Sequence, residues 1–236
     1  MIYQNSQEIL QNRNIYPTRH LVPMIQLQNV SLSYEKVKAI KDFSLTLNQK
    51  EMIFLTGASG AGKTSLLKII SRIIKPNAGT VSYLLDEEIT FAHIFQDLIL
   101  IPYYSIHENL DLLYSAQQFG SFQKFQSDKM ELLQYFNLLD LAHSKIFDLN
   151  GGSKQKVAII RALLTQANCI IADEPTCSMD ENSAQSVYEI LNFYNIKRGT
   201  TIIWATHDKI MVKKYQGKTI HLENGKLIHS GSACFI

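Results

Sequence analysis

The chain has 236 residues, of which 46% are hydrophobic and 19% are charged. This length predicts one large domain, or one domain with an attached subdomain, and the composition excludes an intrinsically disordered chain. The 23 Lys and Arg residues nearly balance the 21 Asp and Glu residues, giving a formal charge of +2. A chain with this balance has no overall excess of basic residues to bind nucleic acid, so no nucleic-acid partner is expected.

The cysteines and the amino-terminal residues exclude further classes of protein. Cys169, Cys177 and Cys234 are too few and too irregularly spaced for a disulfide framework or a zinc site. No window of 18 apolar residues predicts a transmembrane helix, and residues 1–23 lack the apolar region of a secretory signal. We interpret residues 1–23 as a loose extension, or alternatively as a partner-binding arm, ahead of a domain at 24–236.

The first half of this domain begins with strand patterns. Ile25 and Leu27, and later Phe43, Leu45 and Leu47, alternate with polar residues, which predicts strands with one buried face. Residues 52–55 form a continuous apolar run, typical of a strand buried on both faces. A helix should follow the glycine-rich residues 57–62, and we expect residues 76–79 to end it. Its expected apolar positions are Leu66, Leu67, Ile69, Ile70 and Ile73.

Strands and helices alternate through the rest of the chain. Strands are expected at 81–85, 90–95, 169–172 and 201–204, and helices over 105–149, after Gly152 and over 182–196. In the first of these helical regions Met130, Leu132, Leu133, Phe136 and Leu139 recur at helical spacing. Asn224-Gly225 predicts a type I′ hairpin turn. The pattern indicates an α/β core with a helical subdomain inserted at about residues 98–155.

The glycine-rich segment fits the phosphate-loop pattern G-x-x-x-x-G-K-[ST]. Its backbone N–H groups converge on an anion, and the helix that follows adds its positive end. In such a loop Lys63 reaches the β- and γ-phosphates and Thr64 holds Mg²⁺. The alternative is a glycine-rich turn with a surface lysine. The predicted nucleotide-binding residues of the loop are Gly57, Ala58, Ser59, Gly60, Ala61, Gly62, Lys63, Thr64 and Ser65.

Two carboxylates end the predicted strand 169–172. Asp173 at this position can coordinate Mg²⁺, usually through water, and Glu174 can orient or deprotonate an attacking water. The alternative is a pair of solvated carboxylates at a strand end. The phosphate loop elsewhere in the chain favours the catalytic interpretation.

A third set of motifs makes nearly all of residues 24–230 resemble the ATP-binding-cassette (ABC) ATPases. Residues 149–158, LNGGSKQKVA, resemble the family's signature segment, usually written L-S-G-G-Q and followed by a basic residue. Phe95-Gln96-Asp97 resembles the Q-loop, Ser178-Met179-Asp180 the D-loop, and Ala205-Thr206-His207-Asp208 the switch-histidine segment. The resemblance implies a P-loop NTPase core with a mostly parallel sheet and an N-terminal antiparallel β-subdomain.

The resemblance also implies a role for single residues, each of which has a simpler alternative. Tyr34 would stack on adenine, or it is a half-buried strand tyrosine. Gln96 would contact Mg²⁺ and water, or it is a surface amide. His207 would bond the γ-phosphate, or it is a loop histidine. Asp180 would serve the D-loop, and Asn150, Gly151, Gly152 and Ser153 would contact ATP held by another copy of the chain.

Two departures from the family pattern stand out. Asn150 replaces the signature serine and Ser153 replaces the usual Gln or Glu, so activity is expected either to be lowered or to depend on a partner. The interval from Gly79 to Gln96 is short, which leaves a peripheral hairpin or helix there in doubt.

The function implied by the resemblance is hydrolysis of ATP, with Mg²⁺, by a head-to-tail homodimer. The chain would act on the inner face of the plasma membrane, as a cytoplasmic subunit attached to a separate integral membrane subunit. Residues 98–104 would form the docking surface, or alternatively subdomain core.

Within the family, residues 54–70 and 205–208 are most similar to the FtsE-type cell-division ATPases, which implies an FtsX-like partner. The lipoprotein-release and macrolide-export ATPases, with a transporter permease, are close competitors. Two further candidate functions are a soluble ABC ATPase acting on nucleic acid or ribosomes and a regulatory module that hydrolyses ATP weakly.

Overall fold

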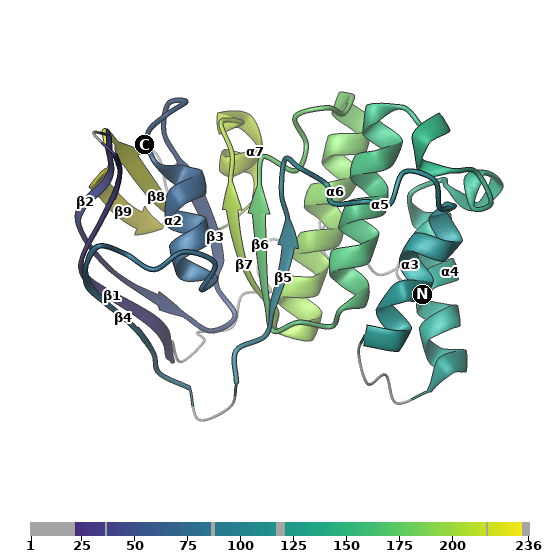
Figure 1. Ribbon diagram of the computed structural model, residues 1–236, viewed down its shortest axis with the longest axis horizontal. Helices are drawn as coiled ribbons and strands as arrows, with labels where there is room; N and C mark the ends of the chain where they lie inside the picture. Colours follow the sequence, from purple (N-terminus) through teal and green to yellow (C-terminus); the bar gives the residue numbers. More distant parts are fainter. Residues whose placement is uncertain (1–21, 36, 86–87, 117–120, 216, 233–236) are drawn as a thin grey trace.

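The computed structural model describes residues 22–35, 37–85, 88–116, 121–215 and 217–232, which form two sheets and the helices around them (Figure 1). All of the interpreted extension 1–23 except its last two residues therefore lies outside the described residues, as does Cys234. Pro23 already belongs to the first strand, where it pairs with Asn48. Among the described helices, none has the length and apolar content needed to cross a bilayer.

The smaller sheet is antiparallel and has the strand order β2-β1-β4. Its strands are β1 (Pro23–Tyr34), β2 (Val37–Asn48) and β4 (Ala78–Tyr83). The alternating apolar residues predicted from the sequence form its inner face: Ile25, Leu27, Phe43 and Leu47 are almost completely buried. The observed strand β4 begins three residues before the predicted strand 81–85 and ends two residues before it does.

The larger sheet has the strand order β5-β6-β7-β3-β8-β9 and is parallel except for its last strand. Its strands are β3 (Met52–Thr56), β5 (Phe91–Ile94), β6 (Cys169–Asp173), β7 (Thr201–Ala205), β8 (Lys218–Glu223) and β9 (Lys226–Ser232). The hairpin between β8 and β9 is confirmed, with Asn224 and Gly225 both at positive φ.

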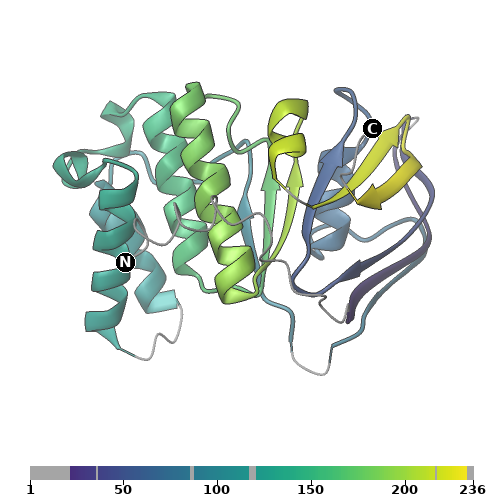
Figure 2. The same ribbon diagram turned by 180° about the vertical axis from the view of Figure 1, so that it is seen from behind.

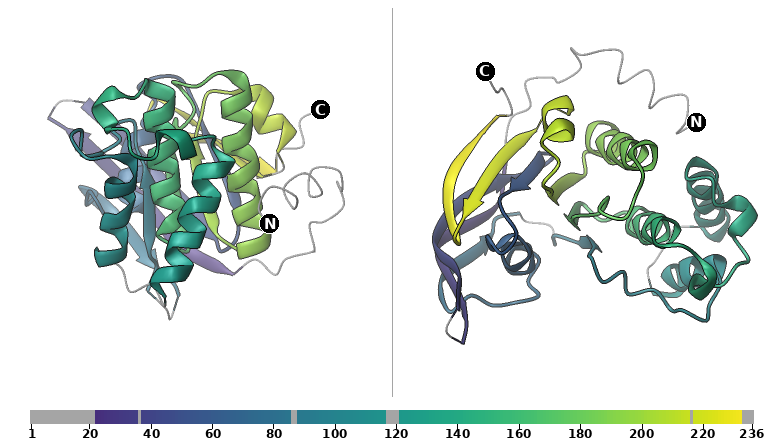
Figure 3. Two further views of the ribbon diagram at one scale, coloured as in Figure 1. Left: turned by 90° about the vertical axis from the view of Figure 1, so that its right-hand side faces the viewer. Right: turned by 90° about the horizontal axis from the view of Figure 1, so that it is seen from above.

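Helices cover both faces of the larger sheet (Figures 1 and 2). They are α2 (Lys63–Ile70), α3 (Ile106–Ala116), α4 (Phe122–Tyr135), α5 (Gly151–Leu164), α6 (Glu181–Phe193) and α7 (Lys209–Lys214). Short 3₁₀ turns occupy Leu139–Leu141 and Ile146–Asp148, and a π-helical turn, Tyr194–Arg198, continues α6. Seen from above, α5 and α6 lie between the sheet and the helices α3 and α4 (Figure 3).

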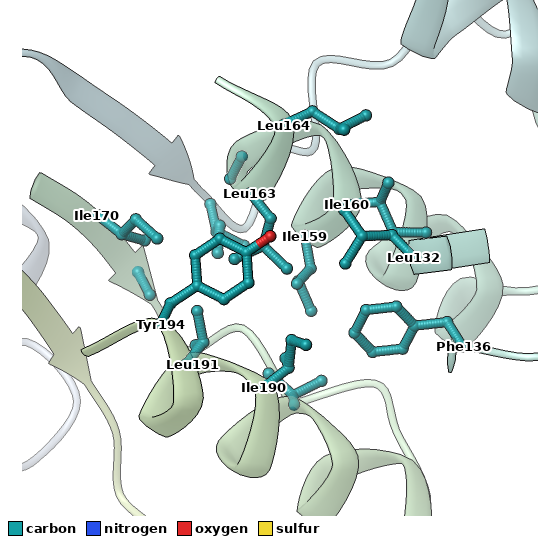
Figure 4. Packing of buried hydrophobic residues seen from close by; sticks show 14 of the residues in the cluster. Leu132, Phe136, Ile159, Ile160, Leu163, Leu164, Ile170, Ile190, Leu191 and Tyr194 are labelled. Atoms are coloured by element: carbon teal, nitrogen blue, oxygen red, sulfur yellow. The ribbon is translucent and has the colours of Figure 1, made fainter. Parts of the chain in front are cut away.

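Alternate side chains of β3 divide the core between these two faces. Ile53 and Leu55 belong to the cluster on the α2 side, whereas Phe54 belongs to the cluster that α5 and α6 complete. Figure 4 shows Tyr194, Leu163 and Ile170 meeting in this second cluster. Because both faces are covered, the interior strands carry continuous apolar runs. The predicted α/β fold with a mostly parallel sheet is confirmed.

The predicted end of the helix after the glycine-rich loop is wrong, and the expected helical region 105–149 is interrupted by a turn of the same kind. Helix α2 ends at Ile70, before residues 76–79 are reached, because Arg72 takes a positive φ and Ile73 N–H donates to the Lys68 carbonyl at 2.9 Å. At the end of α4, Asn137 takes the same conformation and Leu138 N–H donates to Leu133 O at 2.8 Å. Both are Schellman caps closed by residues other than glycine.

The predicted apolar face of 105–149 also needs correction. Met130 and Leu139 are exposed, and Lys129 takes a buried position on α4 at 1% exposure. The Lys129 ammonium lies 2.6 Å from Asp111 of α3, so a charge pair fills a place expected to be apolar. Strand β4 ends at Tyr83 and β5 begins at Phe91, in line with the short interval from Gly79 to Gln96.

Candidate active site

The carboxyl ends of the parallel strands carry most of the predicted site residues. Gly57 follows β3, Gln96 follows β5, Glu174 follows β6 and His207 follows β7. Since these strands are hydrogen-bonded neighbours running in one direction, the four segments meet at one edge of the sheet. This edge is where open α/β sheets bind ligands.

The phosphate loop, residues 57–62, leads from β3 into α2. Gly57 and Gly62 have φ values of 149° and 104°. A Cβ on Gly57 would collide with the Leu222 carbonyl of β8, and one on Gly62 would collide with the Ala39 carbonyl of β2. Glycine is therefore required at both positions by conformation and by space. The contact of Gly62 with Ala39 also packs the smaller sheet against the loop.

Lys63 begins α2 and is 7% exposed. Its ammonium donates to the carbonyl oxygens of Gly57 at 2.9 Å and Ala58 at 3.1 Å. The side chain thus folds back over the loop and holds its positive charge within the ring of loop residues. A phosphate entering the loop would meet that charge together with the amino-terminal end of α2.

Thr64 and Asp173 meet across the site. The Thr64 hydroxyl donates to Asp173 Oδ2 at 2.6 Å. Burial raises the pKa of Asp173, and the hydrogen bond from Thr64 opposes that rise. Among the described residues there is no cluster of three or more His, Cys, Asp or Glu side chains around a common point. The pair fits Mg²⁺, which takes one or two protein oxygens and completes its shell with phosphate and water.

Glu174 links the phosphate loop to the switch-histidine segment. One carboxylate oxygen lies 3.8 Å from the Lys63 ammonium, and the other lies 3.3 Å from His207 Nδ1. Its backbone has a φ of 48°, which is uncommon outside glycine, and its N–H donates to the Ala205 carbonyl at 2.9 Å. The carboxylate thus lies between a buried cation and an imidazole, next to a strained stretch of backbone.

Tyr34 and Gln96 lie at the rim of this arrangement. Tyr34 ends β1 opposite Val37, and 44% of its surface is exposed, so its ring is available for stacking. Gln96 is exposed two residues beyond β5. Among the described residues, no hydrogen bond or ion pair joins either side chain to Lys63, Asp173 or Glu174. Their roles toward adenine and Mg²⁺ stay predictions.

The signature segment lies apart from this cluster. Asn150 caps α5, with its side-chain oxygen accepting from Ser153 N–H at 2.8 Å, and Gly152 packs against the Ser178 backbone. Asp180 caps α6 through Ser183 N–H at 2.9 Å, and this bond lowers the pKa of Asp180. Within the described ranges, neither hydrogen bonds nor ion pairs join residues 150–153 to 57–65. Within one copy of the chain, the described residues 57–65 and 150–153 are thus two groups with no direct polar contact, which we name the phosphate-loop half-site and the signature half-site.

One well-made contact in this region is not predicted by the sequence. The Arg161 guanidinium donates to the carbonyls of Leu98 and Ile99, at 2.8 and 2.5 Å. Arg161 lies 63 residues from Leu98 and 62 residues from Ile99 in the chain. No local pattern shows which distant backbone atoms a long side chain reaches, so only the folded structure reveals the contact.

Comparison with known proteins agrees with this geometry. Residues 40–177 match the family described as ABC transporter. The lipoprotein-releasing system ATP-binding protein LolD of Bacteroides thetaiotaomicron is 31% identical over 86% of this chain and 99% of its own length. The cell division ATP-binding protein FtsE of Bacillus subtilis is 31% identical over 89% and 96%. The phosphonates import ATP-binding protein PhnC of Fusobacterium nucleatum is 30% identical over 86% and 90%.

A solved structure extends the likeness to three dimensions. The ATP-binding cassette MJ0796, in a dimeric post-hydrolysis state bound to ADP and Pi, superposes with a TM-score of 0.80 at 27% identity. The match covers 90% of this chain and all of that one.

Proposed function

Because the chain belongs to the ABC transporter family of ATPases, we propose that two copies hydrolyse ATP head to tail and drive a separate membrane subunit. The observation that carries the head-to-tail pairing is the separation of the two half-sites. Lys63, Glu174 and His207 converge at the sheet edge, whereas Asn150 caps a helix elsewhere. A second copy would bring its residues 150–153 to the γ-phosphate held by the first.

Each group then has a defined task in the proposed reaction. Tyr34 stacks on adenine, the loop N–H groups and Lys63 hold the phosphates, and Thr64 and Asp173, with Gln96, hold Mg²⁺. Bound Mg²⁺ supplies charge that stabilises the transferred phosphoryl group. Glu174 accepts a proton from the attacking water, and His207, 3.3 Å from Glu174, contacts the γ-phosphate. Catalysis is then mainly positioning and electrostatics.

Asn150 provides the first test of the head-to-tail arrangement. Its side-chain oxygen is engaged in the cap, so its amide N–H₂ is the group left to donate to a phosphate. Asn150→Asp keeps the size and the cap but turns a carboxylate toward the phosphate, and Asn150→Ser keeps both a cap and a donor. We expect Asp to lower kcat at least roughly tenfold through like-charge repulsion, and Ser to retain activity. Phosphate release at saturating ATP measures both, and equal rates for the two variants would remove Asn150 from the trans site.

The docking segment, residues 98–104, carries the proposed contact with the membrane subunit. Ile99, Tyr103 and Tyr104 are 65%, 76% and 43% exposed. Phe147, 68% exposed, lies with its ring 6.5 Å from that of Tyr103 and nearly parallel to it. Exposed apolar side chains gathered in this way are typical of a protein–protein contact, so the alternative of ordinary subdomain core is not favoured.

We assign the membrane partner to the FtsX-like class, which gives the chain a cytoplasmic, peripheral position on the plasma membrane and a role in cell division. The similarity of 54–70 and 205–208 to FtsE-type ATPases supports this choice. A lipoprotein-release or export permease is the second candidate, supported by the equal identity to LolD.

Co-purification distinguishes these partners. The full chain is expressed in its native host, membranes are solubilised in detergent, and the integral membrane protein that co-purifies is identified by mass spectrometry. We expect one FtsX-like subunit with the wild type and its loss with Tyr103→Asp. The control Ile228→Asp changes an exposed residue of β9 and should retain it. A permease in its place would select the second candidate, and no membrane subunit would contradict the proposal.

A further inference from the structure

Arg161 joins the helix that begins at the signature to the segment that follows the Q-loop. Its two terminal nitrogens donate to consecutive carbonyls, Nη1 to Ile99 at 2.5 Å and Nη2 to Leu98 at 2.8 Å. The planar guanidinium fork makes both bonds at once, which a lysine ammonium on a flexible stem does not reproduce. Residues far apart in the sequence are thereby held as one unit.

The backbone at this contact is strained. Ile99 has a φ of 48°, and for a β-branched residue this left-handed conformation is a genuine outlier. The Ile99 side chain is 65% exposed, so its own packing does not impose the conformation. The pair of bonds from Arg161 fixes the carbonyls on both sides of the strained φ and ψ angles, and strain of this kind persists only where the surroundings determine it.

A second side chain holds the same segment from α3. Asn109 is 4% exposed; its side-chain oxygen accepts from Ile101 N–H at 2.8 Å, and its amide donates to the Ile101 and Ser105 carbonyls at 3.1 and 2.9 Å. The docking segment is therefore fastened by its backbone to the helical layer, through Arg161 from α5 and Asn109 from α3. Its exposed apolar side chains remain free to contact a partner.

Helix α5 runs from the signature to this point. Ile159, Ile160 and Leu163, beside Arg161 on α5, are buried in the core cluster (Figure 4). Its amino-terminal end is Asn150, eleven residues before Arg161. At the other side of the contact, Leu98 lies two residues beyond Gln96. The docking segment is thus joined to the signature through Arg161 and α5, and to the Q-loop through the chain itself.

We propose that Arg161 is a positioning residue that couples the docking segment to the signature half-site. Contact of the membrane subunit with residues 98–104 would then set the position of Asn150 relative to the γ-phosphate. This inference rests on the proposed function for the identity of the partner and of the trans site. The residue touches neither the phosphate loop nor Glu174, so its effect on ATP binding by the phosphate loop should be small.

The test compares Arg161→Lys with Arg198→Lys, a control that changes a second arginine, which lies over the Tyr194 ring. For Arg161→Lys we expect kcat for ATP to fall roughly ten- to a hundredfold, as misplacement of a catalytic group does, with KM changed less than about twofold. Amide hydrogen exchange should accelerate at 98–101 and at 150–153 and stay unchanged at 57–65. The control should alter neither quantity.

Two different results would overturn the inference. If amide exchange accelerated only at 98–101 and kcat were unchanged, Arg161 would stabilise the local backbone and nothing further. A parallel loss of folded protein, with normal kcat and KM in the remainder, would make it a stability residue. Because kcat and exchange are measured on the isolated chain, they decide the coupling even if co-purification finds no membrane subunit and the proposed partner is wrong.

Discussion

Glu174→Gln is expected to bind ATP but to hydrolyse it roughly 10²- to 10³-fold more slowly than the wild type. The amide keeps the size of the carboxylate between Lys63 and His207 but cannot accept the proton of the attacking water. Phosphate release at saturating ATP and Mg²⁺ measures the rate, and calorimetry measures the binding.

Glu181→Gln is the matched control for this variant. Glu181 is an exposed carboxylate in the first turn of α6, and it lines the same cavity as Glu174 and His207. Its loss should leave the rate within about twofold of the wild type. If Glu174→Gln hydrolysed ATP at the wild-type rate, Glu174 would not be the base, and a different group would have to activate the water.

Lys63→Ala is expected to abolish tight ATP binding. The alanine removes the buried ammonium that faces the loop interior and also the bonds from it to the Gly57 and Ala58 carbonyls. One hydrogen bond to a charged group is worth about 1.5–3 kcal/mol, so the dissociation constant should rise by about 10- to 100-fold or more.

Calorimetric titration of the purified variant with ATP checks this expectation. Lys75→Ala, which changes an exposed lysine just after α2, serves as the control and should bind like the wild type. An unchanged affinity in Lys63→Ala would show that Lys63 does not hold the phosphates, and it would leave the loop N–H groups as the source of binding.

The parts of the fold that could be predicted are those set by local pattern. Buried parallel strands appear in the sequence as continuous apolar runs. The Asn224-Gly225 turn has few conformational alternatives. The glycines and the lysine of the phosphate loop have a spacing that rarely occurs by chance. The order of these elements then places Gly57, Asp173 and His207 at the same sheet edge, since parallel strands share their carboxyl ends.

The parts that could not be predicted depend on residues that break a local rule. Arg72 and Asn137 end helices at positive φ without glycine, and Ile99 adopts that conformation in spite of its branched side chain. Lys129 is buried because Asp111 of another helix neutralises it, and a window along one helix shows no such partner. In each case a tertiary contact overrides the local preference.

The arrangement of two half-sites is tested most directly by the molar mass of Glu174→Gln in solution. Light scattering of the variant with ATP and Mg²⁺, compared with the nucleotide-free sample, should show a change from the mass of one chain to that of two. The pair should contain two bound ATP molecules, and the change should disappear when Asn150→Asp is added. A variant that binds one ATP per chain and keeps the mass of a single chain would contradict the head-to-tail site.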